Sequence, residues 1–263
     1  MMMVGVHVVA ALAGVALGVG AVYVARMVIE GVRRDRRERP AQIAVGLWQE
    51  RWERAAGKLE SEDAAVRLEG FAELEQYGRE DADAHEDIIE LTCTYLRRPF
   101  RFPVEDEEEF AIRLAAQGLL TRRLRRSGGL ESREVEELDL RDAVLVEPDF
   151  ADCDLTGADF RDGVIVGGNF RRARFWRYAN FDRTWFTGVA DFRAAVFPAH
   201  VSFSGAMFTG TAIFAEAEFE GRVDFADARV EEPDAAHSWP SPWYVWAASP
   251  VAHGRLVPRK DKR

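Results

Sequence analysis

The strongest constraint on the fold is a recurrence of large apolar residues at every fifth position. Five residues overshoot the 3.6-residue turn of an α-helix, and an odd step sends successive side chains of a straight strand to opposite faces. Neither element keeps such residues together, whereas a chain that turns a corner every five residues does. The pattern predicts a square coil with these residues inside: Leu140, Leu145, Phe150, Leu155, Phe160, Ile165, Phe170 and Phe175.

After Phe175 the spacing alternates between six and five residues. The positions are Phe181, Phe186, Phe192, Phe197, Phe203, Phe208, Phe214, Phe219, Phe225 and Val230. Four sides of this kind total about 22 residues, so we expect the enlarged corners to stack along two opposite edges of the column. Gly188, Gly210 and Gly221 lie two residues after a Phe in six-residue steps, where we expect the extra residue to need a permissive backbone.

The residues two places before each large one are mostly small, which allows coils to stack closely. Three runs carry both features: Ala158-Asp159-Phe160-Arg161-Asp162, Ala179-Asn180-Phe181 and Ala190-Asp191-Phe192-Arg193-Ala194. They resemble the A-(D/N)-(L/F)-X-X signature of pentapeptide-repeat proteins. The resemblance covers residues 138–230 and implies an all-β, right-handed quadrilateral β-helix, a solenoid of eighteen sides and four and a half coils. We assign residues 130–230 to this domain.

The N-terminal segment predicts a membrane anchor, residues 1–39. Val4–Val24 would span about 31 Å as a helix, and no charged residue precedes Arg26. A cleaved signal peptide and a buried core helix are the alternatives. The first lacks a basic start and a clear cleavage site, and the second is rarely this long. Arg26 and the five arginines at 33, 34, 36, 37 and 39 place the N-terminus outside and the body in the cytoplasm. A stripe of Ala10, Gly14 and Gly18 would allow a homodimer.

Residues 40–129 predict a small α-helical module of four helices. The expected ranges are about 41–59, 62–77, 83–97 and 105–126, with Ser61 as an N-cap and Gly78 just past the second helix. The segment around 64–74 resembles one HEAT-like unit. A docking surface and a spacer between membrane and repeats are both open interpretations. The layout of span, helices and repeats resembles membrane-anchored pentapeptide-repeat proteins of actinobacterial type.

The ends of a solenoid need covers, and residues 130–137 and 231–263 are the candidates. In the second, Trp239, Trp243, Tyr244 and Trp246 are expected to fold over the last coil. The basic residues Arg255, Arg259, Lys260, Lys262 and Arg263 are expected to form a mobile tail that could touch an anionic surface.

Patterns for catalysis, cofactors and metals are missing from the sequence. The five histidines have no metal-ligand spacing, and the two cysteines, Cys93 and Cys153, allow no cysteine-based zinc site. No phosphate-binding or nucleophile motif is present. We therefore expect no enzyme, no cofactor and no metal. The net charge of −10 also argues against nucleic acid as a partner.

The repeat carries its charge in bands, with eight acids in residues 139–162 and six arginines in residues 171–193. We expect a protein-interaction scaffold whose partner is a protein, with a candidate patch of Arg171, Arg172, Arg174, Trp176 and Arg177. Because some pentapeptide-repeat proteins resemble duplex DNA and occupy gyrase, a DNA-mimic inhibitor or protector of a type II topoisomerase is the alternative. The arginine band is unsuited to a duplex mimic. A purely structural spacer is a third possibility.

Overall fold

The computed structural model describes residues 49–81, 84–125, 137–247 and 253–258. The chain divides into two compact units, Met1–Glu53 and Arg54–Arg263. Only residues 49–53 of the first are described, and they are helical. The predicted anchor and its stripe of Ala10, Gly14 and Gly18 lie outside the described residues. Within the described ranges, no helix is both long and apolar enough to cross a bilayer.

The helical module contains α2 (Ala64–Glu80), α3 (His85–Leu96) and α4 (Glu107–Leu124), as the sequence predicts. The N-cap of α2 is Asp63 and not Ser61, because the Asp63 carboxylate accepts hydrogen bonds from Ala65 N and Val66 N. Gly78 is a residue of α2 and does not follow it. A Cβ atom at Gly78 would lie 2.5 Å from Ile88 Cδ1 and 2.6 Å from the guanidinium carbon of Arg123, so these two side chains pack closely against the glycine.

A buried polar cluster holds the three helices together. Arg67 Nε donates to the Tyr95 hydroxyl (3.1 Å), which donates to Glu109 Oε2 (2.9 Å). Arg113 is 2% exposed and donates from Nε to Glu109 Oε1 and from Nη1 to Leu96 O. Burial and the Glu109 hydrogen bond raise the pKa of Tyr95 to about 12. The fold therefore favours the neutral phenol.

This pKa predicts a loss of stability in alkali. The pKa of Tyr95 in the folded protein lies above the unfolded value of about 10. The stabilisation that the neutral Tyr95 gives to the fold is therefore fully present below pH 10. As the pH rises from about 10 to about 12, roughly 2–3 kcal/mol is lost. Urea unfolding of the wild type and Tyr95→Phe at several pH values measures this. The variant should be less stable at pH 8 and the difference should shrink toward pH 12. A constant difference would contradict the prediction.

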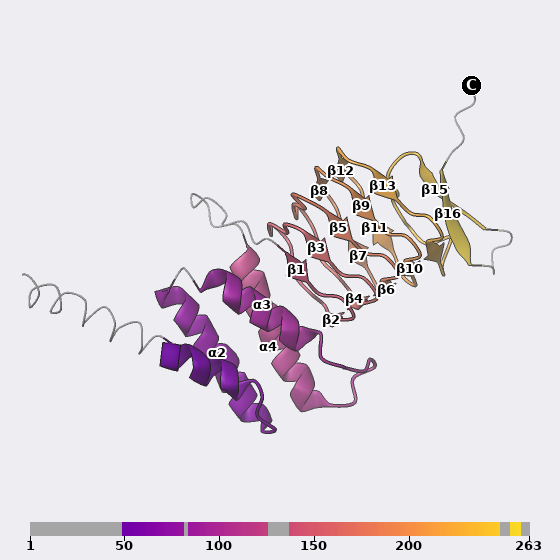
Figure 1. Cartoon of the computed structure of the whole chain (residues 1–263). Coiled ribbons are helices and arrows are strands. Elements are labelled where there is room, and N and C mark those ends of the chain that lie inside the picture. Colours follow the sequence, from indigo (N-terminus) through magenta and orange to yellow (C-terminus); the bar gives the residue numbers. More distant parts are fainter. Residues whose placement is uncertain (1–48, 82–83, 126–136, 248–252, 259–263) are drawn as a thin grey trace, which may run out of the picture. The chain divides into compact units, whose positions relative to one another are not determined.

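The repeat folds into a solenoid with four faces, which confirms the square coil. Face 1 is a five-stranded parallel sheet (Figure 1). Face 2 is a seven-stranded sheet, in which the five strands from the repeat are parallel. Face 1 contains β1 (Leu138–Asp139), β3 (Ala158–Asp159), β5 (Ala179–Asn180), β9 (Val201–Ser202) and β13 (Val223–Asp224). Face 2 contains β2 (Val144–Val146), β4 (Val164–Val166), β6 (Trp185–Thr187), β10 (Met207–Phe208) and β14 (Arg229–Val230).

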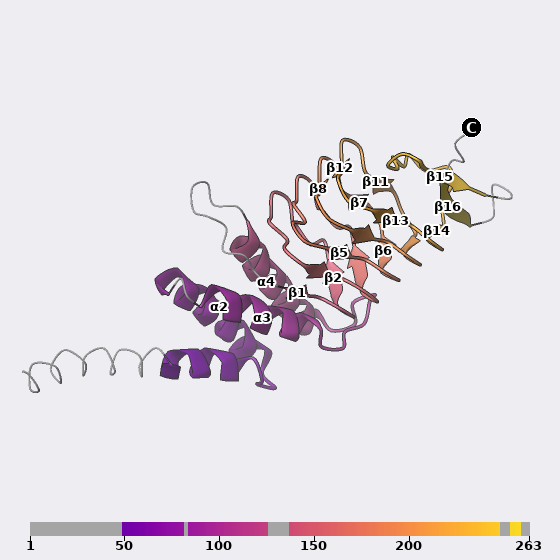
Figure 2. The same ribbon diagram turned by 45° about the horizontal axis from the view of Figure 1, so that its top comes forward.

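Faces 3 and 4 are shorter. Face 3 contains β7 (Ala190–Asp191) and β11 (Ala212–Ile213), preceded by the bridges Asp149–Asn169 and Asn169–Asp191. Face 4 contains β8 (Val196–Phe197) and β12 (Glu218–Phe219), preceded by the bridges Asp154–Arg174 and Arg174–Val196. Within the repeat, each of these two faces has four levels, so the repeat has the predicted four and a half coils. Beyond the repeat, Ser238 adds one more parallel bridge, to Ile213 on face 3. Figure 2 shows how the coils stack.

The strand register confirms the enlarged corners. Leu138 pairs with Ala158, and Ala158 pairs with Ala179. In the later coils Ala179 pairs with Val201 and Val201 with Val223, a separation of 22 residues. The six-residue steps of the later coils therefore fall at the same two corners, between faces 2 and 3 and between faces 4 and 1.

Phenylalanine side chains fill the axis of the solenoid in stacked columns. On face 1, the rings of Phe160, Phe181, Phe203 and Phe225 stack at centroid distances of 4.8, 4.9 and 4.8 Å. Neighbouring columns meet edge to face, as Phe192 and Phe203 do at 5.6 Å. Of the eighteen large positions, only Phe219 is not fully buried. The core is a continuous aromatic stack, which offset and edge-on ring contacts stabilise.

The glycines at the enlarged corners differ from our expectation. Gly188 has a left-handed backbone, with φ of +71°. Gly210 and Gly221 do not have a positive φ. A Cβ atom at Gly210 would instead overlap the carbonyl oxygen of Gly188, and one at Gly221 would overlap that of Ala199. Two of the three glycines are therefore required by the close approach of successive coils.

Helix α4 covers the first coil. Leu124 O accepts a hydrogen bond from Asp154 N (3.0 Å), and the buried Cys153 thiol lies 3.8 Å from Thr121 O. The side-chain amide of Gln117 donates to Val146 O and accepts from Val146 N, both at 3.0 Å. It therefore occupies the backbone edge of β2, where another strand would otherwise pair. Of the segment expected to cover this end, 130–137, only Glu137 lies among the described residues.

Replacing Gln117 with alanine should reduce the free energy of unfolding by about 1–3 kcal/mol, because a buried donor and acceptor of β2 lose their partners. Gln117→Glu keeps an acceptor for Val146 N but cannot donate to Val146 O at neutral pH, and we expect a similar loss. Chemical denaturation measures both variants. Exposed Gln76→Ala is the control. Equal stability of the wild type and both Gln117 variants would show that this contact does not support the edge.

Part of the predicted C-terminal cover lies over the last coil. The Trp239 ring lies 5.2, 5.6 and 5.8 Å from those of Phe208, Phe214 and Phe225, and Trp243 contacts Phe225. Strand β16 (Gly254–Pro258) pairs with β14 and with β15 (Trp243–Trp246), which extends face 2 (Figure 1). Trp246 is 53% exposed, so it does not fold over the coil as we expected.

Candidate functional site

The predicted patch lies on face 4 and its two corners. Arg171 and Arg172 form the corner after Phe170, where Arg172 has a left-handed backbone with φ of +56°. Arg174 lies on the face, between Asp154 of the preceding coil and Val196 of the next. Trp176 and Arg177 follow at the corner that leads to face 1. The five residues therefore do not form one cluster.

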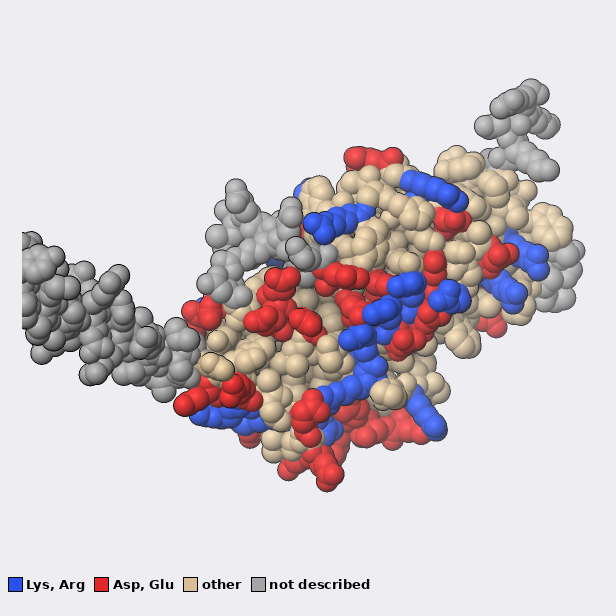
Figure 3. Space-filling view, in the orientation of Figure 1, with Lys and Arg blue, Asp and Glu red and all other residues tan. Residues whose placement is uncertain are grey.

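Two arginines of the arginine band form ion pairs with aspartates of the acidic band one coil below. Arg172 donates to both carboxylate oxygens of Asp152, at 2.8 and 2.7 Å. Arg183 makes the same bidentate contact with Asp162, at 2.6 Å for both bonds, and this contact lowers the pKa of Asp162. Figure 3 shows basic and acidic side chains interspersed on the face of the molecule that is in view. At these two positions the positive and negative charges compensate each other.

Trp176 is the most distinctive member of the patch. It is 45% exposed, and its Nε1 donates to Asp154 Oδ1 at 3.3 Å. The guanidinium of Arg174 lies 5.5 Å from the centre of its ring, within the range of a cation–π contact. Arg171 makes no side-chain ion pair within 4 Å among the described residues. Trp176 therefore presents an exposed ring with Arg174 beside it, and among the described residues neither Arg174 nor Arg171 has an ion-pair partner within 4 Å.

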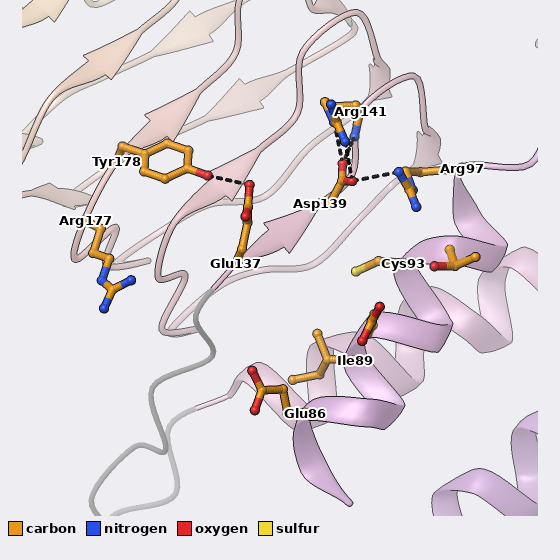
Figure 4. Close-up of a pocket in the computed structure, with 11 residues that line it drawn as sticks. Glu86, Ile89, Cys93, Arg97, Glu137, Asp139, Arg141, Arg177 and Tyr178 are labelled. Atoms are coloured by element: carbon orange, nitrogen blue, oxygen red, sulfur yellow. Dashed lines mark hydrogen bonds and ion pairs between the residues drawn. The ribbon is translucent and has the colours of Figure 1, made fainter.

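Arg177 lies away from these three, in a cavity of about 490 Å³ between α3 and the first coils (Figure 4). Tyr178 donates to Glu137 (2.8 Å), and Asp139 accepts from Arg97 (2.7 Å) and Arg141 (2.8 Å). The hydrogen bond from Arg141 has the largest effect on the pKa of Asp139 and lowers it. Burial acts in the opposite direction, but the charge of Arg97 adds to the effect of Arg141, so the pKa is lowered overall. The contact between Arg97 and Asp139 joins the module to the solenoid, and together these contacts involve four of the charged residues that line the cavity.

Both cysteines are buried, and burial raises the pKa of each thiol. Cys93 lines the cavity, whereas Cys153 packs beneath α4. In the ranges that the structure describes, no group of three or more His, Cys, Asp or Glu side chains could hold a metal ion.

The chain forms a four-faced parallel β-solenoid with a helical module at its first coil. More narrowly, it carries pentapeptide repeats: the family model for pentapeptide repeats matches eight copies at residues 139–177. The match covers the strict five-residue registers, and the solenoid continues beyond it through the six-residue steps to Val230. No significant match was found among curated proteins or among solved structures.

Proposed function

We propose that this chain is a non-enzymatic scaffold that binds a protein partner through the outer surface of its pentapeptide-repeat solenoid. The observation that carries the proposal is the exposed Trp176 with Arg174 beside its ring, and Arg171 at the other corner of the same face. Trp and Arg are the residue types that contribute most to protein interfaces. The patch stands on a parallel ladder above a packed phenylalanine core, so little conformational entropy is lost on binding.

In-cell crosslinking of the tagged full-length protein tests this role. The test variant is Arg171→Gln with Arg174→Gln and Trp176→Ala. Arg172 is left intact, because it donates two hydrogen bonds to Asp152 in the coil below. Arg54→Gln with Arg101→Gln is the control and removes the same charge from exposed positions of the helical module. One reproducible partner that the test variant loses and the control keeps would support the scaffold. If no partner is captured, the structural-spacer interpretation gains support.

The proposal includes a single-pass anchor at residues 4–24, with the N-terminus outside and the solenoid in the cytoplasm. Its support is the uncharged length of this segment and the arginines that follow it. Carbonate extraction of the membrane fraction distinguishes a span from a peripheral contact. The full chain should stay with the membrane, and a chain lacking residues 1–25 should be released. Release of the full chain would remove the anchor from the proposal.

DNA mimicry is not part of the proposal. A duplex presents a continuous row of negative charge. In the solenoid, Asp139, Asp152, Asp159, Asp162 and Asp191 each contact an arginine. A gyrase supercoiling assay should therefore show no inhibition by the protein at micromolar concentration.

A further inference from the structure

Face 2 carries one continuous row of outward side chains across its last strands. The strand registers place Trp185 beside Met207, Met207 beside Arg229, Arg229 beside Arg255, and Arg255 beside Trp246. Their neighbours along the strands, Phe186, Phe208, Val230 and Leu256, are buried, so these five side chains point away from the core. At about 4.8 Å per strand the row is roughly 19 Å long.

The two arginines in the middle of this row are uncompensated. Arg229 and Arg255 are both exposed and directly opposite each other, and like charges in this arrangement destabilise a sheet. In the described part of the chain, no carboxylate lies within 4 Å of either guanidinium. By contrast, Arg161, Arg172, Arg183 and Arg193 each contact an aspartate. An anionic ligand would remove the repulsion between Arg229 and Arg255.

Apolar side chains lie on both sides of the arginine pair. Trp246 is 53% exposed at one end and Trp185 is 52% exposed at the other, with the half-buried Met207 between Trp185 and Arg229. A ligand that fits the row would therefore carry an acidic centre with apolar groups on both sides. All five side chains stand on hydrogen-bonded strands, which fixes their spacing.

We propose that this row, the Trp–Arg surface, binds an acidic amphipathic helix of a partner protein. The strand spacing of about 4.8 Å is close to the 5.4 Å rise of one helical turn. A helix laid across the strands would place one residue per turn above each strand, with acids at two successive turns above Arg255 and Arg229 and apolar residues at the adjoining turns. Arginine is suited to this role because it holds a carboxylate through two parallel hydrogen bonds.

A lipid headgroup would offer the same negative charge, but the surroundings favour a linear ligand. The exposed Glu231 and Glu232 lie directly beyond Arg229 and Val230. A flat anionic bilayer that reached the arginines would also approach these two acids. A helix aligned with the row would contact the arginines and pass beside the acids. The inference rests on the proposed scaffold role and specifies a partner class for a second surface, remote in sequence from Trp176.

The test measures binding of a labelled helical peptide to the full chain in neutral detergent by fluorescence anisotropy. The alanine-based peptide carries Leu, Glu, Glu, Leu and Leu at successive turns of one face, and a control peptide has Gln in place of both Glu. We expect the acidic peptide to bind, and Arg229→Gln with Arg255→Gln to weaken it about tenfold or more. Arg183→Gln with Arg193→Gln, which removes the same charge from ion-paired positions, should change the affinity less than twofold.

The arginine variants should remain folded, because they relieve a repulsion, and an unchanged or higher melting temperature verifies this. Equal binding of the two peptides, or binding that survives loss of both arginines, would overturn the inference. It would also be overturned if the peptide fails to bind while phosphatidylglycerol added to the micelles shifts tryptophan emission in an Arg229- and Arg255-dependent way. That outcome would assign the surface to a membrane. Partner capture through Trp176 would stand in each case, so the two proposals fail separately.

Discussion

Replacing Phe192 with alanine is expected to reduce the free energy of unfolding by about 3–5 kcal/mol. Phe192 is completely buried, and its ring stacks between Phe170 at 4.7 Å and Phe214 at 4.8 Å. It also meets Phe181 and Phe203 edge to face. The cavity lies in the middle of the column and cannot be closed, because the coil spacing is fixed by backbone hydrogen bonds on every face.

Urea unfolding followed by circular dichroism measures the change. Phe192→Leu keeps most of the volume and should cost clearly less than the alanine variant. Val189→Ala is the control for a neighbouring residue outside the core, since Val189 is 47% exposed, and it should change the stability by less than about 0.5 kcal/mol. A loss at Phe192 no larger than that at Val189 would show that the aromatic column is not the stabilising core.

The substitution Gly210→Ala should cost about 3 kcal/mol or more, although it adds a single methyl group. The added Cβ would overlap the carbonyl oxygen of Gly188 and lie 2.6 Å from the Gly188 carbonyl carbon. Both are backbone atoms of the coil below, so no side chain can move aside. The two coils would have to separate at this corner and weaken the hydrogen bonds of the adjoining faces.

Gly57→Ala is the matched control for this prediction. Gly57 lies within a helix, and a Cβ there would meet no atom within 4 Å. Because alanine is the better helix former, this variant should gain about 0.5–1 kcal/mol. Thermal unfolding of the two variants should therefore shift in opposite directions. A destabilisation at both positions, or at neither, would contradict the role assigned to the corner glycine.

Much of the solenoid could be predicted from the spacing of its large residues. The five-residue step requires a corner between successive residues, and the change to six and five residues correctly located the larger corners. The reason for Gly210 and Gly221 could not be predicted, because it depends on the distance between coils and not on a local backbone angle. The role of Gln117 was missed for a similar reason: nothing in α4 indicates which of its side chains will meet the edge of β2.

The candidate surface was predicted less well than the fold. The arginines at 172 and 183 were interpreted as part of an outward-facing band, but each contacts an aspartate 20 or 21 residues earlier. The signal was present in the sequence, since this separation equals one coil of the early solenoid. The Arg229–Arg255 pair could not be predicted, because β16 returns antiparallel to β14 from beyond the repeat. The right-handed sense of the coil, the HEAT-like unit and the homodimer stay predictions.

The stacking of coils at intervals of 22 residues also has a mechanical consequence. Each of the later coils contacts only the coils beside it and any cover at the end, so a force applied from the C-terminal side would meet one coil at a time rather than the whole domain. Every coil that detaches would release 22 residues, which extend to about 75 Å at ~3.4 Å each. Under tension the solenoid would therefore lengthen in equal steps, with the coils next to α4 remaining folded while the outer ones unwind.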